Sequence, residues 1–157
     1  MSDWIGNFAR DVAIFCPSAA VEPTTFIRDD GSSYRGVFAS TQDDQTASIE
    51  VWWDVLGGWN LTIADTLSQE CDSNEESRRH VETLIWLTIW GGCAVVESRH
   101  RRYFVADPGS IASAARINAD GFKTLREWRA WTGRSPLLEE RVASYGTDPT
   151  WCQIKHV

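Results

Sequence analysis

Apolar side chains recur every three or four residues within Asp3–Cys16, which is the spacing of one face of an amphipathic helix. Pro17 cannot continue a helix and ends the pattern. We therefore expect a helix over this segment. Its apolar face consists of Trp4, Phe8, Val12 and Phe15.

Two short β-strands are predicted next, at Thr24–Ile27 and Ser33–Ala39. The residues Asp29-Asp30-Gly31 between them are typical of a tight turn, because glycine adopts a positive φ without steric cost. The polar stretch Ser40–Ala47 is expected to be a loop.

Apolar and polar residues then alternate in Ile49–Val55 and Trp59–Ile63, which predicts a β-hairpin. A shift of one residue in the pairing would move every side chain to the other face. A two-residue turn at Gly57-Gly58 would place the two apolar sets on opposite faces. A three-residue loop, Leu56-Gly57-Gly58, makes the apolar sets coincide, so we predict this loop with Gly58 in the left-handed region. The predicted pairs are Val55 with Trp59, Trp53 with Leu61, and Val51 with Ile63.

This register leaves Trp52 on the polar face of the hairpin, flanked by Glu50 and Asp54 and opposite Thr62. It is the tryptophan that the pattern alone places outside the core. Two interpretations stay open: Trp52 is exposed, or a helix covers that face of the sheet as well. The residues that follow the hairpin, up to Ser73, are predicted to be an acidic loop.

The strongest predicted helix spans Asn74–Trp90, with Ser73 or Asn74 as its N-cap and Gly91 at the C′ position. The second half of this helix is apolar nearly all round and holds two tryptophans. Because a helix that is apolar on all sides is buried on all sides, we expect that half to run through the centre of the domain.

A second hairpin is predicted from the strands Cys93–Ser98 and Arg102–Val105. Beyond it the pattern leaves Ile111–Asn118 open, because its alanines favour a helix while Ala115–Ile117 also fits a strand. Apolar residues at helical spacing then predict a helix over Phe122–Trp131.

Ser135 followed by Pro136 is typical of a capped helix start, and that helix is expected to run to Tyr145. The tail Trp151–Val157 is expected to add a short strand or helix. The sequence thus predicts a single α+β domain over residues 1–157. In this domain a mostly antiparallel sheet of hairpins packs around a buried Trp-rich helix, with helices at the N- and C-terminal ends.

The charge is divided unevenly along the chain. The net charge is −7 overall, but residues 1–76 carry −11 and residues 77–157 carry +4. A surface of one sign can steer a partner of opposite sign, although it also serves solubility alone. Nucleic-acid binding is not expected at a pI near 4.9, because phosphate contacts require clustered Lys and Arg.

The N-terminus has no basic segment followed by an apolar run, and the longest apolar run, Leu84–Trp90, is far shorter than the ~20 residues of a membrane helix. We therefore expect a cytoplasmic protein without membrane association. The four cysteines form no CxxC pair and are expected to be reduced. They are Cys16, Cys71, Cys93 and Cys152.

Motifs for catalysis, cofactors and metals give no positive signal. GxGxxG, the phosphate-binding P-loop, GxSxG and HExxH do not occur. Cys152 and His156 are four apart, but a structural zinc site needs two further ligands, and a buried thiol beside a surface imidazole is the simpler interpretation. The run Arg99–Arg102 either binds an anion or an acidic partner or forms a solvated hairpin loop. We expect no enzyme, cofactor, metal or small-molecule substrate.

The segment IEVWWDVLGGWNLTIADTLSQE, followed by a helix into IWGG and then by AVVESR and RRYF, resembles a family of immunity proteins. That family neutralises NAD-glycohydrolase toxins of actinobacteria, and its type member is the antitoxin of the tuberculosis necrotizing toxin. The resemblance continues more loosely, as an order of strand and then helices, through ARINADGFKTLREWRAWTG and PLLEERVASY. None of these motifs is catalytic.

The resemblance implies a non-enzymatic protein that binds a cognate secreted toxin in the producing cell and blocks its NAD-binding cleft. A different class of function stays open, a small-molecule- or peptide-binding regulatory or adaptor domain whose tryptophans line a pocket. An enzyme whose site carries no motif is a third possibility, with Cys93 or His100 as its candidates.

The partner-binding residues are predicted from the charge of one segment and the register of the hairpin, and not from the resemblance. The acidic segment from Asp43 to Asp54 would supply a complementary field, and Trp52 would supply an anchor, since tryptophan is enriched at binding hot spots. The predicted partner-binding residues are Asp43, Asp44, Glu50, Trp52 and Asp54.

Overall fold

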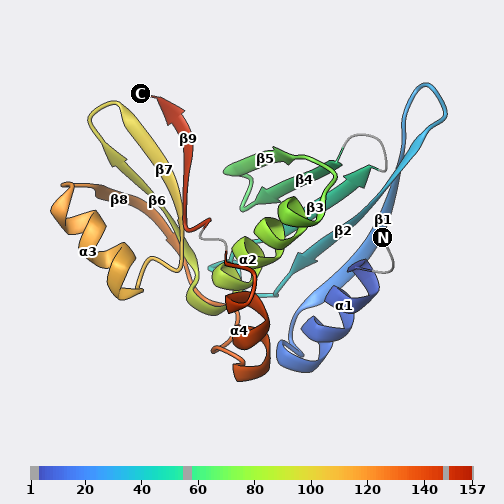
Figure 1. Ribbon diagram of the computed structural model, residues 1–157, viewed down its shortest axis with the longest axis horizontal. Coiled ribbons are helices and arrows are strands. Elements are labelled where there is room, and N and C mark those ends of the chain that lie inside the picture. The colour runs from blue at the N-terminus through green and yellow to red at the C-terminus, as the bar shows by residue number, and fades with distance from the viewer. Residues whose placement is uncertain (1–3, 55–57, 147–148, 157) are drawn as a thin grey trace. The chain divides into compact units, whose positions relative to one another are not determined.

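The computed structural model describes residues 4–54, 58–146 and 149–156. Within these residues the chain is α+β and its sheets are antiparallel, as predicted, but there are two sheets rather than one, together with four helices (Figure 1). The chain divides into two compact units, residues 1–44 with 48–78 and residues 45–47 with 79–157. Two units can belong to one domain, so the single domain predicted over residues 1–157 stays a prediction.

The first unit holds one helix and a five-stranded sheet in which each strand pairs with the next along the chain (Figure 1). This meander needs only hairpin connections, because every pair is antiparallel. The elements are α1 (Trp4–Phe15), β1 (Ala20–Ile27), β2 (Ser33–Ser40), β3 (Ile49–Asp54), β4 (Gly58–Ile63) and β5 (Leu67–Cys71).

Helix α1 packs its predicted apolar face into the core of this unit. Trp4, Phe8 and Val12 are buried. The ring of Trp4 stacks on Phe8 at 5.2 Å and meets Trp59 of β4 edge-on, also at 5.2 Å. These aromatic contacts join the helix to the sheet.

The first hairpin is confirmed, and its turn contains Gly31 at a φ of 85°. Strand β1 begins at Ala20, earlier than predicted, and runs through Pro23. An edge strand tolerates proline where the missing N–H does not leave a neighbouring strand unpaired. β1 is such an edge strand, since its one neighbour is β2.

The hairpin of β3 and β4 has the predicted faces but not the predicted pairs. The observed partners are Trp53 with Trp59, Val51 with Leu61 and Ile49 with Ile63. A shift of two residues keeps every side chain on its face, so the hydrophobic alternation could not distinguish these registers. Gly58 has the predicted positive φ, 87°, while residues 55–57 of the predicted loop lie outside the described residues.

The acidic loop predicted after β4 is wrong, because Leu67–Cys71 forms strand β5 on the edge of β4. Leu67 is buried opposite Ile63, and this one apolar anchor fixes a strand that is otherwise polar. The free N–H and C=O groups of β4 also require partners. Pairing with β4 therefore outweighs the weak local pattern.

The second unit contains most of α2 and a four-stranded antiparallel sheet in the order β8-β6-β7-β9. After the hairpin of β6 and β7, helices and strands alternate along the chain (Figure 1). The elements are α2 (Glu75–Gly91), β6 (Cys93–Ser98), β7 (Arg101–Ala106), α3 (Ile111–Ala119), β8 (Lys123–Trp128), α4 (Pro136–Ala143) and β9 (Trp151–His156).

Helix α2 begins and is buried as predicted. The Asn74 side chain accepts a hydrogen bond from the backbone N–H of Ser77 at 2.8 Å, which identifies Asn74 as the N-cap. The helix is buried from Val81 onward except for the half-buried Leu87 and Gly91. Gly91 was predicted at C′, but it is the last helical residue, and Gly92 takes the left-handed conformation with a φ of 70°.

The helix predicted over Phe122–Trp131 is wrong, because Lys123–Trp128 is strand β8, paired with β6. Leu125 and Trp128 are three residues apart, which suits a helix face, and nothing local excludes a helix. Gly121, with a φ of 68°, ends α3 and directs the chain along β6. Strand pairing then overrides the helical propensity of this segment.

The remaining elements agree better with the predictions made from the sequence. Ile111–Asn118, which the pattern left open, lies in helix α3, with Ser110 as its N-cap. Ser135 caps α4 with Pro136 in its first turn, as predicted. The tail forms strand β9, so Cys152 and His156 do not share a helical face. None of the helices in the three described ranges combines the length and apolar character that crossing a membrane requires.

We predict that Gly92→Ala destabilises the protein by at least ~2 kcal/mol, because it adds left-handed strain and a collision of the new Cβ with the Trp128 backbone. Thermal unfolding should shift down by roughly 4–8 °C. Gly133→Ala is the matched control, since Gly133 has open space and no positive φ, and it should change stability by less than ~0.5 kcal/mol. Equal effects of the two substitutions would contradict this account of Gly92.

Candidate functional site

The two faces of the first sheet differ in character. Residues that pair across an antiparallel sheet point to the same face, and neighbours along a strand point to opposite faces. Val37, Val51 and Leu61 pair across β2, β3 and β4 and are at most 1% exposed, so their face is the core face. The opposite face carries the predicted Glu50 and Trp52.

Two rows of paired residues cross this opposite face from β1 to β5. All of their members are exposed or half-buried except Gly36. We call these ten residues the acidic face. The first row is Glu22, Phe38, Glu50, Thr62 and Ser68, and the second is Thr24, Gly36, Trp52, Asn60 and Glu70.

Trp52 lies near the middle of the acidic face and is held there by two contacts. Its indole ring packs over Gly36 of β2, where a Cβ would lie 2.8 Å from Cδ2 of the ring. Its Nε1–H donates a hydrogen bond to the carboxylate of Glu50, two residues earlier on the same strand. Trp52 is half-buried, a state between the two interpretations that the sequence left open.

The acidic face carries three carboxylates, from Glu22, Glu50 and Glu70, and none of its ten residues is basic. Asp54 occupies a position on the same face, two residues beyond Trp52, although its side chain lies outside the described residues. A sheet face with carboxylates around an aromatic ring attracts cationic groups over a Debye length of about 8 Å at physiological ionic strength.

The structure brings together only part of the predicted site. Glu50 and Trp52 are in contact on β3. Asp43 and Asp44 are exposed in the loop between β2 and β3 and are not members of the acidic face. The backbone N–H of Asp43 donates to the Thr41 hydroxyl at 3.1 Å, which shapes that loop.

Sequence reasoning missed Glu22, Phe38 and Glu70. Glu22 precedes the predicted start of the first strand, and Glu70 was placed in a loop. Phe38 could have been found, because it is spaced two and four residues from Gly36 and Tyr34 in a predicted strand.

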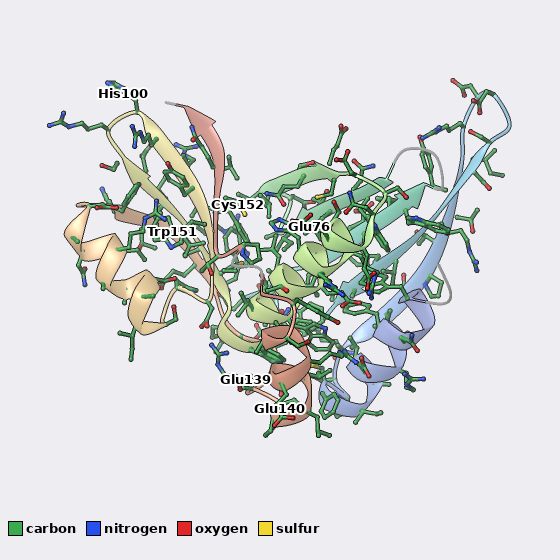
Figure 2. The ribbon with its side chains drawn as sticks, viewed as in Figure 1. Glu76, His100, Glu139, Glu140, Trp151 and Cys152 are labelled. Atoms are coloured by element: carbon green, nitrogen blue, oxygen red, sulfur yellow. The ribbon has the colours of Figure 1, made fainter. Side chains whose placement is uncertain are left out.

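The basic run Arg99–Arg102 divides between two roles. Arg102 pairs with Glu97 across the hairpin at 3.0 Å. Arg99 and His100 form the two-residue turn between β6 and β7, with His100 at the tip of the hairpin (Figure 2). Arg99, His100 and Arg101 line a cavity of about 490 Å³ in the second unit.

The four cysteines all lie within the described residues and form no disulfide, and burial lowers the reactivity of two of them. Burial raises the pKa of the Cys16 thiol to about 11 and that of Cys93 to about 12. Cys93 begins β6 while His100 lies beyond its far end, about 20 Å away at the rise of a β-strand. Within the described ranges, no three His, Cys, Asp or Glu side chains are grouped so that they could hold a metal ion.

The fold and this site define an α+β protein with an acidic, aromatic sheet face. No protein-family model, curated protein or solved structure matches the chain.

We predict that a thiol reagent at pH 8 modifies Cys71 first. Cys71 is half-buried, whereas Cys16, Cys93 and Cys152 are buried. With a pKa of about 12, only about one in ten thousand Cys93 thiols is ionised at pH 8. Mass spectrometry of the folded protein should show one fast adduct, absent from Cys71→Ser, and further adducts only in denaturant. Fast labelling of Cys93 in the folded state would contradict the burial described.

Proposed function

We propose that this protein is a cytoplasmic immunity protein, an antitoxin that binds a cognate secreted toxin in the producing cell and blocks its active site. The toxin is an NAD glycohydrolase, the class that the sequence resemblance implies. The acidic face, with Trp52 fixed at its middle, is the observation that carries the proposal.

Trp52 has the properties of a binding anchor. Hot spots in interfaces are enriched in tryptophan and lie near the centre of the contact. Ordering a free side chain on binding costs about 0.5–1.5 kcal/mol. The contacts of Trp52 with Gly36 and Glu50 restrict the ring before a partner arrives, so less of that cost remains.

The sign of the charge fits the proposed target. A cleft that holds the pyrophosphate of NAD presents backbone N–H groups and cationic side chains to its ligand. An acidic face is complementary to such a cleft, and complementary charge raises the association rate and excludes partners of the wrong sign. Glu22, Glu50 and Glu70 would supply this complement across the width of the sheet.

The alternative function is a small-molecule- or peptide-binding regulatory domain. For that function we expect tryptophans to line a pocket. No tryptophan is among the described residues that line the cavity at the β6–β7 turn. The tryptophan with the most suitable position for a partner lies on an open sheet face instead. This difference favours recognition of a protein surface by the first unit.

We predict that Trp52→Ala raises the Kd for the toxin at least ~30-fold, the factor that corresponds to a hot-spot loss of 2 kcal/mol. Asp54→Lys should mainly lower the association rate and its dependence on salt. Biolayer interferometry with the candidate toxin domain, identified among the products of neighbouring genes, would measure both quantities. Inhibition of NAD hydrolysis by the same proteins would report on the active site.

Glu140→Lys is the matched control, because Glu140 is an exposed carboxylate on α4 in the second unit (Figure 2). This variant reverses one charge outside the acidic face and should inhibit like the unmodified protein. Thermal unfolding of each variant separates loss of binding from loss of folding. If folded Trp52→Ala and Asp54→Lys bind and inhibit normally, the acidic face is not the interface. A neighbouring gene product without toxicity would contradict the function itself.

A further inference from the structure

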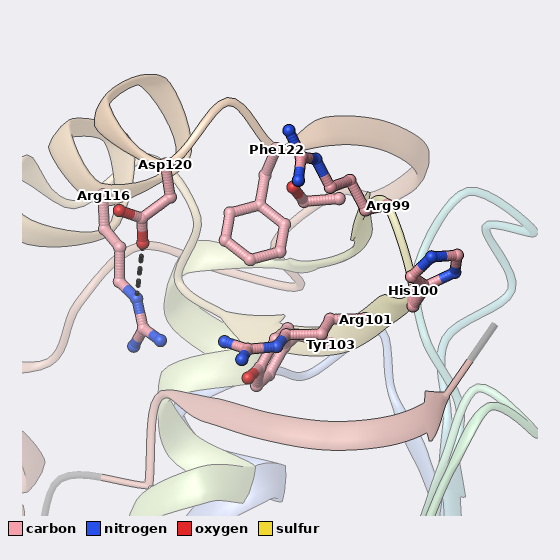
Figure 3. A pocket seen from close by; sticks show the side chains of 8 residues that line it. Arg99, His100, Arg101, Tyr103, Arg116, Asp120 and Phe122 are labelled. Atoms are coloured by element: carbon pink, nitrogen blue, oxygen red, sulfur yellow. Dashed lines mark hydrogen bonds and ion pairs between the residues drawn. The ribbon is translucent and has the colours of Figure 1, made fainter.

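The cavity at the β6–β7 turn combines cationic and aromatic side chains. Figure 3 shows the Phe122 ring with Arg116 and Asp120 to one side and Arg99 to the other, while His100 points away from this group. Ser98 contributes from the end of β6. Besides Ser98 and His100, the cavity is lined by Arg99, Arg101, Tyr103, Arg116, Asp120 and Phe122.

Two neighbours hold Arg116 in place. Its Nε lies 3.4 Å from Oδ2 of Asp120, one helical turn later. The guanidinium group also lies over the ring of Trp151, 4.2 Å from the ring centroid. Arg116 is 45% exposed at its side chain, so it is oriented yet still accessible to a ligand.

The hairpin turn positions the other two cations. Arg99 adopts a left-handed conformation with a φ of 47°, which closes the two-residue turn. Arg101 begins β7 directly after the turn, and both side chains are exposed. The cavity thus has three guanidinium groups and one carboxylate, and that carboxylate is already paired with Arg116.

Aromatic rings form the apolar part of the site. Tyr103 meets Phe122 edge-on at 5.5 Å, and Trp151 lies 5.7 Å from Tyr103 and 5.4 Å from Phe122. All three rings are half-buried. Tyr103 and Phe122 therefore reach the cavity from a packed cluster that fixes their orientation.

We propose that this cavity binds a nucleotide-sized phosphate ester, with its phosphate facing the arginines that line the cavity, Arg99, Arg101 and Arg116, and a flat ring against Phe122 and Tyr103. Guanidinium groups match phosphate oxygens in pairs, which makes arginine the usual residue for phosphate recognition. A volume of about 490 Å³ falls in the range of small-molecule sites and exceeds what a phosphate ion alone would fill. The site lies in the second unit and does not depend on the acidic face.

The test is isothermal titration calorimetry of the full chain with AMP, UMP, ribose 5-phosphate, inorganic phosphate and an aspartate-rich peptide at 150 mM NaCl. We expect AMP or UMP to bind with a Kd below ~1 mM and ribose 5-phosphate to bind at least ~10-fold more weakly, because stacking is lost. Arg99→Asn and Arg101→Ser should each weaken nucleotide binding about 10-fold. Asparagine tolerates the left-handed conformation of position 99, so the turn is preserved.

Arg141→Ala, an exposed arginine on α4 of the same unit, is the matched control and should leave nucleotide affinity unchanged. Thermal unfolding confirms that each variant is folded. Three results would overturn the proposal: no binding of AMP or UMP at 5 mM, equal binding of inorganic phosphate and nucleotides, or binding of the acidic peptide alone. Nucleotide binding that survives both arginine substitutions in folded protein would place the ligand elsewhere and would also overturn it.

Discussion

The pairing of β3 between β2 and β4 is the constraint on which the candidate interface depends. Because side chains alternate along a strand, the register that buries Val51 between Val37 and Leu61 also turns Trp52 to the opposite face. The same pairing sets Gly36 beside Trp52, which gives the indole ring room to lie against the sheet. The core and the candidate interface are therefore fixed by one set of backbone hydrogen bonds, and a one-residue slip would destroy both.

The sequence predicts elements well where a local signal determines the structure. Asn74 and Ser135 cap their helices, and the apolar end of α2 is buried. Both features could be predicted because helix capping and helix burial depend on residues that are close together in the sequence. Strand β8 and strand β5 were missed, since each is an edge strand with polar composition. Such strands are fixed by the free edge of a neighbour distant in sequence, and no local pattern describes that edge.

The residues of the candidate site could likewise be predicted only where a local pattern places them. The alternation along β3 correctly placed Glu50 and Trp52 on the face away from the core. It could not supply Glu22 or Glu70, because these residues join the acidic face only through pairing across the sheet. Asp43 and Asp44 were grouped with the site by proximity in sequence, and the loop before β3 keeps them off the acidic face.

The uneven charge along the chain corresponds to the different charges of the two candidate sites. Residues 1–76 carry −11, and within them the sheet displays carboxylates around an aromatic ring on an open face, a geometry suited to a macromolecular surface. Residues 77–157 carry +4, and there three arginines line a cavity beside packed aromatic rings, a geometry suited to a small anion. A half-buried side chain on an open sheet face, such as Trp52, becomes fully buried only when another protein covers it. A cavity already provides most of its own walls, so Phe122 and Tyr103 need only a ligand of fitting size. The two proposed ligands therefore differ in charge because the surfaces differ in sign, and in size because one surface is a sheet face and the other is a cavity.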